Sequence, residues 1–234
     1  MKNLAFSLFA FLIVSCNYDL QNSISGNGNV VTKEVRTGTF NNLNVSNALD
    51  VVIIPSDSQK VVIKADENLV DVIKVRVRDN TLLISSERRI RLARSKKIEV
   101  YTRELEQIEA SAAATIKNSE SLSAENFKIA CSSAAEIIIN GHFGDLKVEA
   151  SSASNVKLYG QSNNIRANVS SAAGLNAFGM TVENASVWAS SAANAKVFVT
   201  HEANFDASSA GSIIYEGDPI VKNINTSSGG SVNK

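Results

Sequence analysis

A three-residue motif, Ser-Ser-Ala, recurs along the second half of this 234-residue chain and constrains its fold more than any other feature. Its copies, with a Ser-Ser-Gly variant at the end, begin at Ser132, Ser151, Ser170, Ser190, Ser208 and Ser227. The successive spacings are 19, 19, 20, 18 and 19 residues. Degenerate copies begin at Ser46 and Ser111. A repeat of this length is typical of a solenoid, in which each repeat forms one coil.

The residues on both sides of each motif alternate between apolar and polar. The third residue before the first Ser is apolar in every copy: Leu43, Ile108, Ile129, Val148, Ala167, Val187, Phe205 and Ile224. The fifth residue after it is also apolar in every copy: Val51, Ile116, Ile137, Val156, Leu175, Ala195, Ile213 and Val232. Alternation with period two is typical of a strand with one buried face. Each repeat therefore predicts two short strands that meet at a corner.

These observations predict an all-β fold, a single-stranded parallel β-helix (β-solenoid) in which equivalent positions of coils of about 19 residues stack as columns. We expect small residues at the corner because bulk would separate adjacent coils, so Leu at Ala153 or Ala172 should overpack it. Opposite corners would use glycines at positive φ, at Gly141, Gly160, Gly179 and Gly217. A helical solenoid is excluded because no segment has a 3.6-residue period, and a β-sandwich is the stronger alternative.

The composition excludes two broad classes of protein. Hydrophobic residues make up 44% of the chain, which is too many for a disordered protein. Lys and Arg total 23, as do Asp and Glu, so the formal net charge is zero and no nucleic-acid partner is expected. Aromatic residues make up 6% and there are two prolines, which fits regular repeating β-structure.

The first half of the β-rich chain, residues 26–103, is less regular than residues 104–234. Alternating or apolar runs at 49–54, 60–65, 72–78, 81–85 and 96–102 predict strands. Asp79-Asn80 predicts a tight hairpin turn between two of them. We expect these strands to start the same sheet as the coils and to cap its end, so that residues 26–234 form one β-helical domain.

Several motifs of this half occur in a recognisable order. They are Gly26-Asn27-Gly28-Asn29-Val30, Phe40-x-x-Leu43-x-Val45, Asp50-Val51-Val52-Ile53, Ile63-Lys64-Ala65-Asp66-Glu67-Asn68-Leu69 and Asn80-x-Leu82-x-Ile84. Together with the Ser-Ser-Ala coils, this order resembles the auto-transporter adhesin head GIN domain family over roughly residues 27–217. The resemblance implies a right-handed β-helix and an adhesin-like role, and it carries no catalytic residues. Since only Ser227–Lys234 follow the coils, we expect membrane attachment at the other end of the chain.

The N-terminus carries an export signal. Residues 1–15 combine Lys2 with an apolar run of about eleven residues, which is shorter than the ~20 that a transmembrane helix needs. The run ends in Ile13-Val14-Ser15-Cys16, which resembles the bacterial lipobox, and the resemblance implies lipid attachment at Cys16. The alternative is an ordinary signal peptide with a chance cysteine. We therefore predict a signal peptide (1–15), a tether (16–25) and a Gram-negative outer-membrane lipoprotein, exposed on the cell surface or facing the periplasm.

Candidate catalytic and metal-binding residues are few. Glycosidases need two converging carboxylates, and the outward-facing candidates are Asp50, Glu136, Glu149 and Asp206. They occupy polar columns on different coils, so we expect no enzyme. The two histidines, His142 and His201, lie in expected loops of different coils, and no metal or cofactor site is predicted. Cys131 falls in an apolar column and should be a buried, inert thiol.

Charge is distributed unevenly along the chain. Residues 71–103 hold ten basic and four acidic side chains, whereas residues 104–234 hold eight basic and thirteen acidic ones. The basic side chains cluster at Arg88, Arg89, Arg91, Arg94, Lys96 and Lys97. This cluster is a candidate site for anionic glycans or lipid headgroups. The alternative, which we favour from the sequence, is a solvated loop that protects a sheet edge from pairing.

Three functions remain open from the sequence. The first is a non-enzymatic adhesin or binding module for a glycan or a cell-surface protein, using flat rows of hydroxyl and amide groups. The second is a structural envelope protein that forms homo-oligomers through the open ends of its β-helix. The third, which the scattered carboxylates disfavour, is a polysaccharide-active enzyme.

Overall fold

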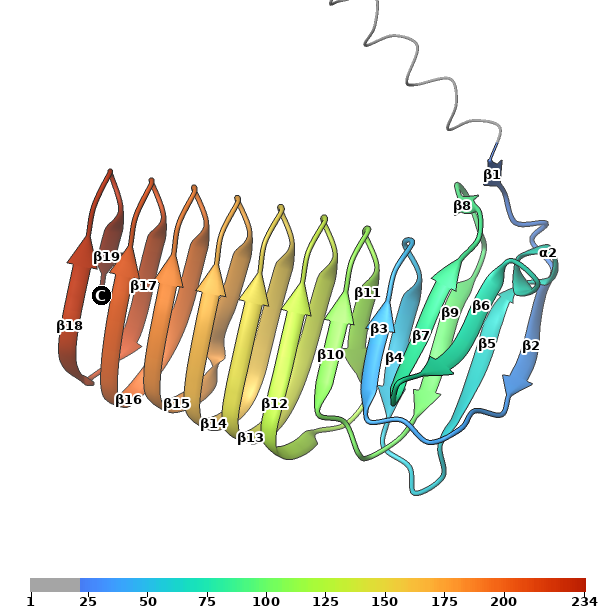
Figure 1. Ribbon diagram of the computed structural model, residues 1–234, viewed down its shortest axis with the longest axis horizontal. Coiled ribbons are helices and arrows are strands. Elements are labelled where there is room, and N and C mark those ends of the chain that lie inside the picture. Colours follow the sequence, from blue (N-terminus) through green and yellow to red (C-terminus); the bar gives the residue numbers. More distant parts are fainter. Residues whose placement is uncertain (1–21) are drawn as a thin grey trace, which may run out of the picture.

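The computed structural model describes residues 22–234 (Figure 1). The expected signal peptide, Cys16 and most of the expected tether lie outside the described residues. No helix in the described part of the chain has the length and apolar character that a membrane crossing requires.

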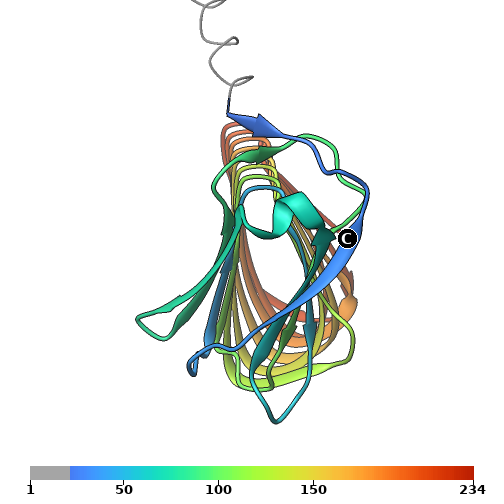
Figure 2. The same ribbon diagram turned by 90° about the vertical axis from the view of Figure 1, so that its right-hand side faces the viewer.

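The second half of the chain forms the predicted stack of parallel coils, seen side-on in Figure 1 and end-on in Figure 2. Its strands are β10 (Gln107–Ala110), β11 (Thr115–Asn118), β12 (Leu122–Cys131), β13 (Glu136–Ala150), β14 (Asn155–Val169), β15 (Gly174–Ala189), β16 (Asn194–Ala207), β17 (Ser212–Gly217), β18 (Ile220–Thr226) and β19 (Ser231–Asn233). Strands β13 to β16 bend midway, so each contributes to two faces. We name these the pre-corner face, whose strand segments lead into a Ser-Ser-Ala corner, and the post-corner face, whose segments leave it.

The predicted columns are present in register. Ile129 pairs with Ile108 on one side and Val148 on the other, and the column continues through Val187 to Phe205. The column after the corner is likewise continuous from Val51 to Val232. The inward-facing side chains of both columns are buried along most of the stack. Parallel pairing between successive coils confirms the β-helix and rules out the β-sandwich alternative.

The Ser-Ser-Ala corners differ from the expectation in one respect. The second and third residues of each copy from Ser111 to Ser208 are left-handed, with φ between 49° and 61°. Two successive left-handed residues form a tight turn, closed by the Ala135 N–H donating to Ser132 O at 3.1 Å. Ala153 and Ala172 therefore point into solvent, and the expectation that they pack between coils is wrong. The packed small residue is the next one: Ala135, Ser154, Ala173, Ala193 and Gly211.

The glycines at the opposite bends have two different roles. Gly160 and Gly217 have φ of 105° and 93°, as predicted. Gly141 and Gly179 do not have positive φ, so that prediction is wrong for them. These two positions require glycine because an aromatic ring occupies the space that a side chain would fill. A Cβ on Gly141 would lie 2.3 Å from the Phe143 ring, and one on Gly179 would lie 2.4 Å from the Tyr159 ring.

The N-terminal half starts the stack but does not follow chain order in space. Its elements are β1 (Ser23–Ile24), β2 (Val30–Val35), β3 (Asn42–Val45), β4 (Asp50–Ile54), β5 (Lys60–Asp66), α2 (Glu67–Val70), β6 (Ile73–Arg78), β7 (Thr81–Ser86), β8 (Arg89–Ile90) and β9 (Lys96–Tyr101). The coil formed by β3 and β4 lies between β10/β11 on one side and β7/β9 on the other. Its corner at Ser46 stacks on the corner at Ser111, as their similar flanks predict.

The far side of this half closes the end of the β-helix. Strand β5 pairs antiparallel with both β2 and β9, and α2 places Leu69 and Val70 on the core (Figure 2). The hairpin of β6 and β7 turns at Asp79-Asn80, both with positive φ, as predicted. Antiparallel strands cover the end because a further parallel coil would leave another open edge.

Candidate binding face

Two outward columns run along the pre-corner face, one on each side of the buried column that contains Ile129. The fourth residue before each corner contributes Asn42, Gln107, Lys128, Lys147, Arg166, Ser186, Asn204 and Asn223. The second residue before each corner contributes Asn44, Glu109, Ala130, Glu149, Asn168, Trp188, Asp206 and Asn225. Neighbouring parallel strands lie about 4.8 Å apart, so these columns repeat polar groups at that spacing along the axis.

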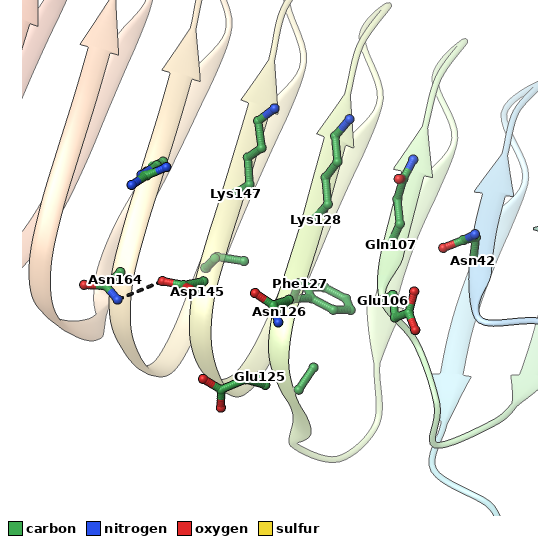
Figure 3. Close-up of a pocket in the computed structure, with 13 residues that line it drawn as sticks. Asn42, Glu106, Gln107, Glu125, Asn126, Phe127, Lys128, Asp145, Lys147 and Asn164 are labelled. Atoms are coloured by element: carbon green, nitrogen blue, oxygen red, sulfur yellow. Dashed lines mark hydrogen bonds between the residues drawn. The ribbon is translucent and has the colours of Figure 1, made fainter.

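A recess on this face has a volume of about 880 Å³ and is shown in Figure 3. Lys128 and Lys147 line one side of it in Figure 3, and Asn126, Asp145 and Asn164 line the other. Arg166 also lines the recess and is the register partner of Lys147 on the next coil. Asn164 Nδ2 donates to Asp145 Oδ1 at 2.7 Å, and Asn184 Nδ2 donates to Asn164 Oδ1 at 3.0 Å. The recess is an open groove with both signs of charge, which suits a polar ligand more than a strongly ionic one.

Glu149 is engaged by two lysines next to this groove. Lys147 Nζ lies 2.8 Å from Glu149 Oε1, and Lys128 Nζ lies 3.2 Å from Glu149 Oε2. The hydrogen bond from Lys147, with help from Lys128, holds the pKa of this carboxyl below its usual value. A glycosidase acid needs a raised pKa, so Glu149 is suited to an ion pair and not to proton donation.

Two smaller recesses lie on the same face. One, of about 320 Å³, forms where Ala130 leaves a gap between Glu109 and Glu149. The other, of about 250 Å³, lies beside Trp188 and is otherwise lined by Ser186, Asn204, Phe205, Asp206, Asn223 and Asn225. Trp188 is 44% exposed, and in register it stands between Asn168 and Asp206. An indole left half in water beside amides and a carboxylate is a platform for a ligand with one apolar face.

The other predicted carboxylates are not brought together. Asp50 and Glu136 lie on the post-corner face, where Lys96 is 4.0 Å from Asp50 and Lys157 is 2.9 Å from Glu136. Glu149 and Asp206 share a pre-corner column, but Asn168 and Trp188 stand between them. Thr115 likewise stands between Asp50 and Glu136 in their column, and none of the recesses described above is lined by two of these four carboxylates.

The predicted histidines and cysteine are also placed by the fold. His142 and His201 are exposed on β13 and β16, within strands and not in loops, and Ser121 Oγ lies 3.1 Å from His142 Nδ1. Within residues 22–234 there is no group of three His, Cys, Asp or Glu side chains that could hold a metal ion. Cys131 is buried as predicted, and burial raises the pKa of its thiol to about 11.

The predicted basic cluster is divided by the structure. Lys96 reaches Ala48 O and lies 4.0 Å from Asp50, and Lys97 lies 3.1 Å from Glu99. These lysines support the first coils. The arginines belong to a separate loop, residues 88–94, which we call the arginine loop. Arg89, Arg91 and Arg94 are exposed there, while Arg88 donates to Ser23 O at 2.7 Å.

Buried Asp66 fixes the base of this loop. Its carboxylate accepts hydrogen bonds from the N–H groups of Gly28 at 2.9 Å, Ser95 at 2.9 Å and Arg94 at 3.2 Å. Burial alone would raise the pKa of Asp66, but these donors hold it below its usual value. A Cβ on Gly26 would lie 2.0 Å from Asp66 Oδ2, which explains the first glycine of the Gly-Asn-Gly-Asn motif.

Trp188 was not selected as a site residue from the sequence. The signal was nevertheless present, because Val187 and Ala189 occupy inward columns and the residue between them must point outward. It is also the single tryptophan of the chain.

The fold is shared with several solved structures of low sequence identity. A "putative adhesin" from Bacteroides fragilis is 19% identical, with a TM-score of 0.83 over 90% of this chain and 99% of that one. A "putative lipid binding protein" from Parabacteroides distasonis is 20% identical, with a TM-score of 0.73 over 91% and 99%. A "putative adhesin" from Parabacteroides merdae is 18% identical, with a TM-score of 0.66 over 91% and 98%. At these identities the likeness establishes the fold alone.

Sequence comparison identifies the family. No curated protein matches the chain. The family model described as "Putative auto-transporter adhesin, head GIN domain" matches residues 39–219, which covers most of the coils and most of the N-terminal half. The chain therefore belongs to the auto-transporter adhesin head GIN domain family.

Proposed function

We propose that this protein is a non-enzymatic binding module of the bacterial cell envelope, and that its pre-corner face binds an extended glycan. An adhesin-like family is one of bacterial cell-surface or envelope proteins. The observation that carries the proposal is Trp188, half exposed and flanked along the coil axis by rows of amide and carboxylate groups.

The chemistry of this face matches that of a sugar chain. A sugar ring presents an apolar face of C–H groups and a rim of hydroxyls. The Trp188 indole offers an apolar surface with little conformational freedom to lose, and Asn204 and Asn223 both donate and accept hydrogen bonds. The coil spacing of about 4.8 Å is close to the length of one sugar unit in an extended chain. Successive sugar units could therefore meet polar side chains at equivalent positions of successive coils.

The charges favour a neutral sugar chain over an acidic one. None of the seven residues that line the Trp188 recess is cationic, and Asp206 contributes a carboxylate. In the larger groove, Lys128 and Lys147 are already paired with Glu149. An acidic polymer would have to break these ion pairs and approach Asp206, whereas hydroxyl groups can hydrogen-bond to the face as it stands.

The proposal is tested by a glycan array probed with the wild type, Trp188→Ala and Tyr159→Ala. Tyr159 is 46% exposed on the post-corner face, so its loss removes a similar aromatic surface from the other side. We expect binding to neutral oligosaccharides by the wild type and by Tyr159→Ala, and at least a tenfold loss in Trp188→Ala. Silence of the wild type across the array, or equal losses in both variants, would contradict the proposal.

We further propose that a lipid on Cys16 anchors the protein to the outer membrane. The supporting observation is the lipobox-like sequence Ile13-Val14-Ser15-Cys16. Several acyl chains together would give stable attachment, at about 0.8 kcal/mol for each buried CH₂. Labelling with a radioactive fatty acid should mark the wild type and not Cys16→Ser. Equal labelling of the two would contradict the anchor.

A second candidate function is self-association, and exposed apolar side chains on β18 favour it. Ile220 is 58% exposed and Ile224 is 47% exposed, although Ile224 continues the buried column of the coils. Pairing of two β18 edges would cover them. Light scattering should then show a dimer that Ile224→Lys dissociates. A wild-type monomer at all concentrations tested would rule this candidate out.

A further inference from the structure

The chain enters the β-helix beside the arginine loop. Strand β1 pairs in parallel with β8, with Ser23 opposite Arg89 and Ile24 opposite Ile90. The Arg91 N–H donates to Ile24 O at 2.9 Å, and the Gly26 N–H donates to Leu92 O at 2.7 Å. These backbone bonds fix the end of the expected tether against the loop, as Figures 1 and 2 show for β1 and β8.

The length of chain before this point limits how far the loop can be from an anchored Cys16. Five residues lie between Cys16 and Asn22, the first described residue. An extended chain spans at most about 3.6 Å per residue, so Asn22 must lie within about 20 Å of the Cys16 backbone. A lipid on Cys16 would therefore hold the β1–β8 side of the protein close to the bilayer surface.

The loop that faces this surface is cationic with an apolar tip. Residues 88–97 contain six basic and no acidic side chains. Lys96 and Lys97 are engaged by Asp50 and Glu99, so the exposed Arg91 and Arg94 carry the proposal below, although Arg94 Nη1 also lies 3.5 Å from Gly28 O. Leu92 is 75% exposed at the tip. Two acids of the described residues next to the loop have partners of their own: Asp66 is buried under three N–H donors, and Glu87 lies 3.3 Å from Lys74.

We propose that the arginine loop is a membrane-contact surface that binds anionic lipid headgroups, with Leu92 entering the interface between headgroups and acyl chains. Guanidinium groups bind phosphate through paired, charge-assisted hydrogen bonds. Basic segments next to a lipid anchor add a second attractive force toward anionic bilayers. The inference rests on the Cys16 anchor proposed above, since that anchor determines which side of the protein meets the membrane.

An anionic glycan is the other ligand class that arginines could bind. The location of the arginine loop and its apolar tip favour the bilayer over the glycan. The arginines lie where the chain enters the β-helix from the tether. Transfer of an exposed leucine from water into a membrane is favourable, whereas contact with a highly hydrated polyanion is not. This ligand would also differ from the neutral glycan proposed for the pre-corner face, which lies on separate strands.

The test uses the lipidated protein with a fluorophore attached at Ala93→Cys, an exposed residue beside Leu92, or at Asn225→Cys on the last coil as a control. Background labelling of Cys131 is low because the thiol is buried. Each protein is reconstituted in neutral phosphatidylcholine vesicles or in vesicles with about a third of phosphatidylglycerol, both with a lipid-borne quencher. Retention on the neutral vesicles reports the anchor, and quenching reports contact by the loop.

We expect quenching at Ala93→Cys to be several-fold stronger in the anionic vesicles and to fall as salt rises from about 0.1 M to about 1 M, which shortens the Debye length from ~10 Å to ~3 Å. Arg91→Gln with Arg94→Gln should abolish this difference. The matched control Lys147→Gln with Arg166→Gln removes the same charge from the pre-corner face and should leave it unchanged.

Three outcomes would overturn the proposal. The label at Ala93→Cys could be quenched equally in both kinds of vesicle, the two pairs of substitutions could have equal effects, or the label could respond to a sulfated polysaccharide and not to anionic vesicles. Retention of Arg91→Gln/Arg94→Gln on neutral vesicles, together with an unchanged far-ultraviolet circular dichroism spectrum, shows that the variant is folded and anchored. Loss of the wild type from neutral vesicles would instead refute the anchor.

Discussion

The regular coils (residues 104–234) and the elements of residues 22–103 that close the end of the β-helix, which we call the cap, are stabilised by different chemistry. In the coils, each strand finds the same apolar columns above and below it, and Ser154 and Ser162 are the buried polar side chains of residues 104–234. The cap instead buries two carboxylates, Asp66 and Glu99. Apolar columns are enough to align a coil when the coils on both sides of it have the same shape. The end of the stack needs antiparallel strands and a loop whose positions are fixed by hydrogen bonds.

Glu99 illustrates the difference. Its side chain is held by Lys64 at 2.7 Å, Lys97 at 3.1 Å and Tyr101 at 3.1 Å. Burial alone would raise its pKa, but these three donors hold the pKa below its usual value. The residue opposite Glu99 on β4 is Val52, so an acid replaces the apolar residue of the adjoining strand. Directional bonds of this kind specify one arrangement of β4, β5 and β9.

The largest loss of stability is expected from a cavity in a coil. Ile137 is fully buried in the column after the corner. Ile137→Ala should lower the free energy of unfolding by about 2–5 kcal/mol, because it removes packed methylenes that both neighbouring coils contact. Urea denaturation measures the loss. Hydrogen exchange should show it first in β11, β13 and β14, and exchange confined to the cap would contradict the account of the coils.

A paired substitution at one corner tests which residue the coils pack. Ala173 is 1% exposed and Ala172 is exposed at φ of 59°. Ala173→Leu should cost about 1–3 kcal/mol through overpacking. Ala172→Leu should cost less than about 1 kcal/mol, because its side chain points into water. Thermal melting of the two variants gives the comparison, and equal losses would mean that the phase of the corner is misassigned.

In the cap, Asp66→Asn should change the pH dependence of stability. The folded pKa of Asp66 is held below its ordinary value, so the carboxylate stabilises the fold above pH ~4 and this contribution is lost as pH falls through the folded pKa. The wild type should therefore lose stability in acid more steeply than Asp66→Asn. Melting temperatures between about pH 2 and 6 measure the two slopes, and parallel curves would contradict the role assigned to Asp66.

The smallest effect on stability is expected from removing the backbone strain of a left-handed alanine at a corner. Ala172→Gly removes the cost of a left-handed alanine, and the last corner already has Gly229 at the equivalent position with φ of 77°. The variant should be stabilised by up to about 1 kcal/mol, offset in part by the greater freedom of glycine when unfolded. A loss of more than about 1 kcal/mol in urea denaturation would show that the Ala172 methyl group packs against something.

The coils were more predictable from the sequence than the cap, for a physical reason. A column such as Ile108, Ile129 and Val148 repeats in the sequence because each coil contacts only its neighbours, so spacing alone gives the register. The placement of β7 and β9 beside β3 and β4 has no such signal, since these strands carry no copy of the corner motif. The exposed corner alanines were misassigned because small residues suit both a packed position and a left-handed one.

The candidate site was only partly predictable. The alternation placed Glu149 and Asp206 outward, and the structure agrees. It did not show that lysines on the same and the neighbouring strand hold Glu149, or that the basic cluster separates into structural lysines and an arginine loop. Those outcomes depend on side-chain reach between strands, which the repeat does not encode.

The most direct test of the proposed glycan-binding face uses the fluorescence of Trp188, the single tryptophan of the chain. A neutral oligosaccharide identified on the array is titrated into the wild type, and emission and acrylamide quenching are recorded. If the sugar stacks on the indole, emission should shift to shorter wavelength and quenching should fall, because a side chain that is 44% exposed becomes covered. Unchanged emission and quenching at a concentration that saturates binding by calorimetry would contradict this account.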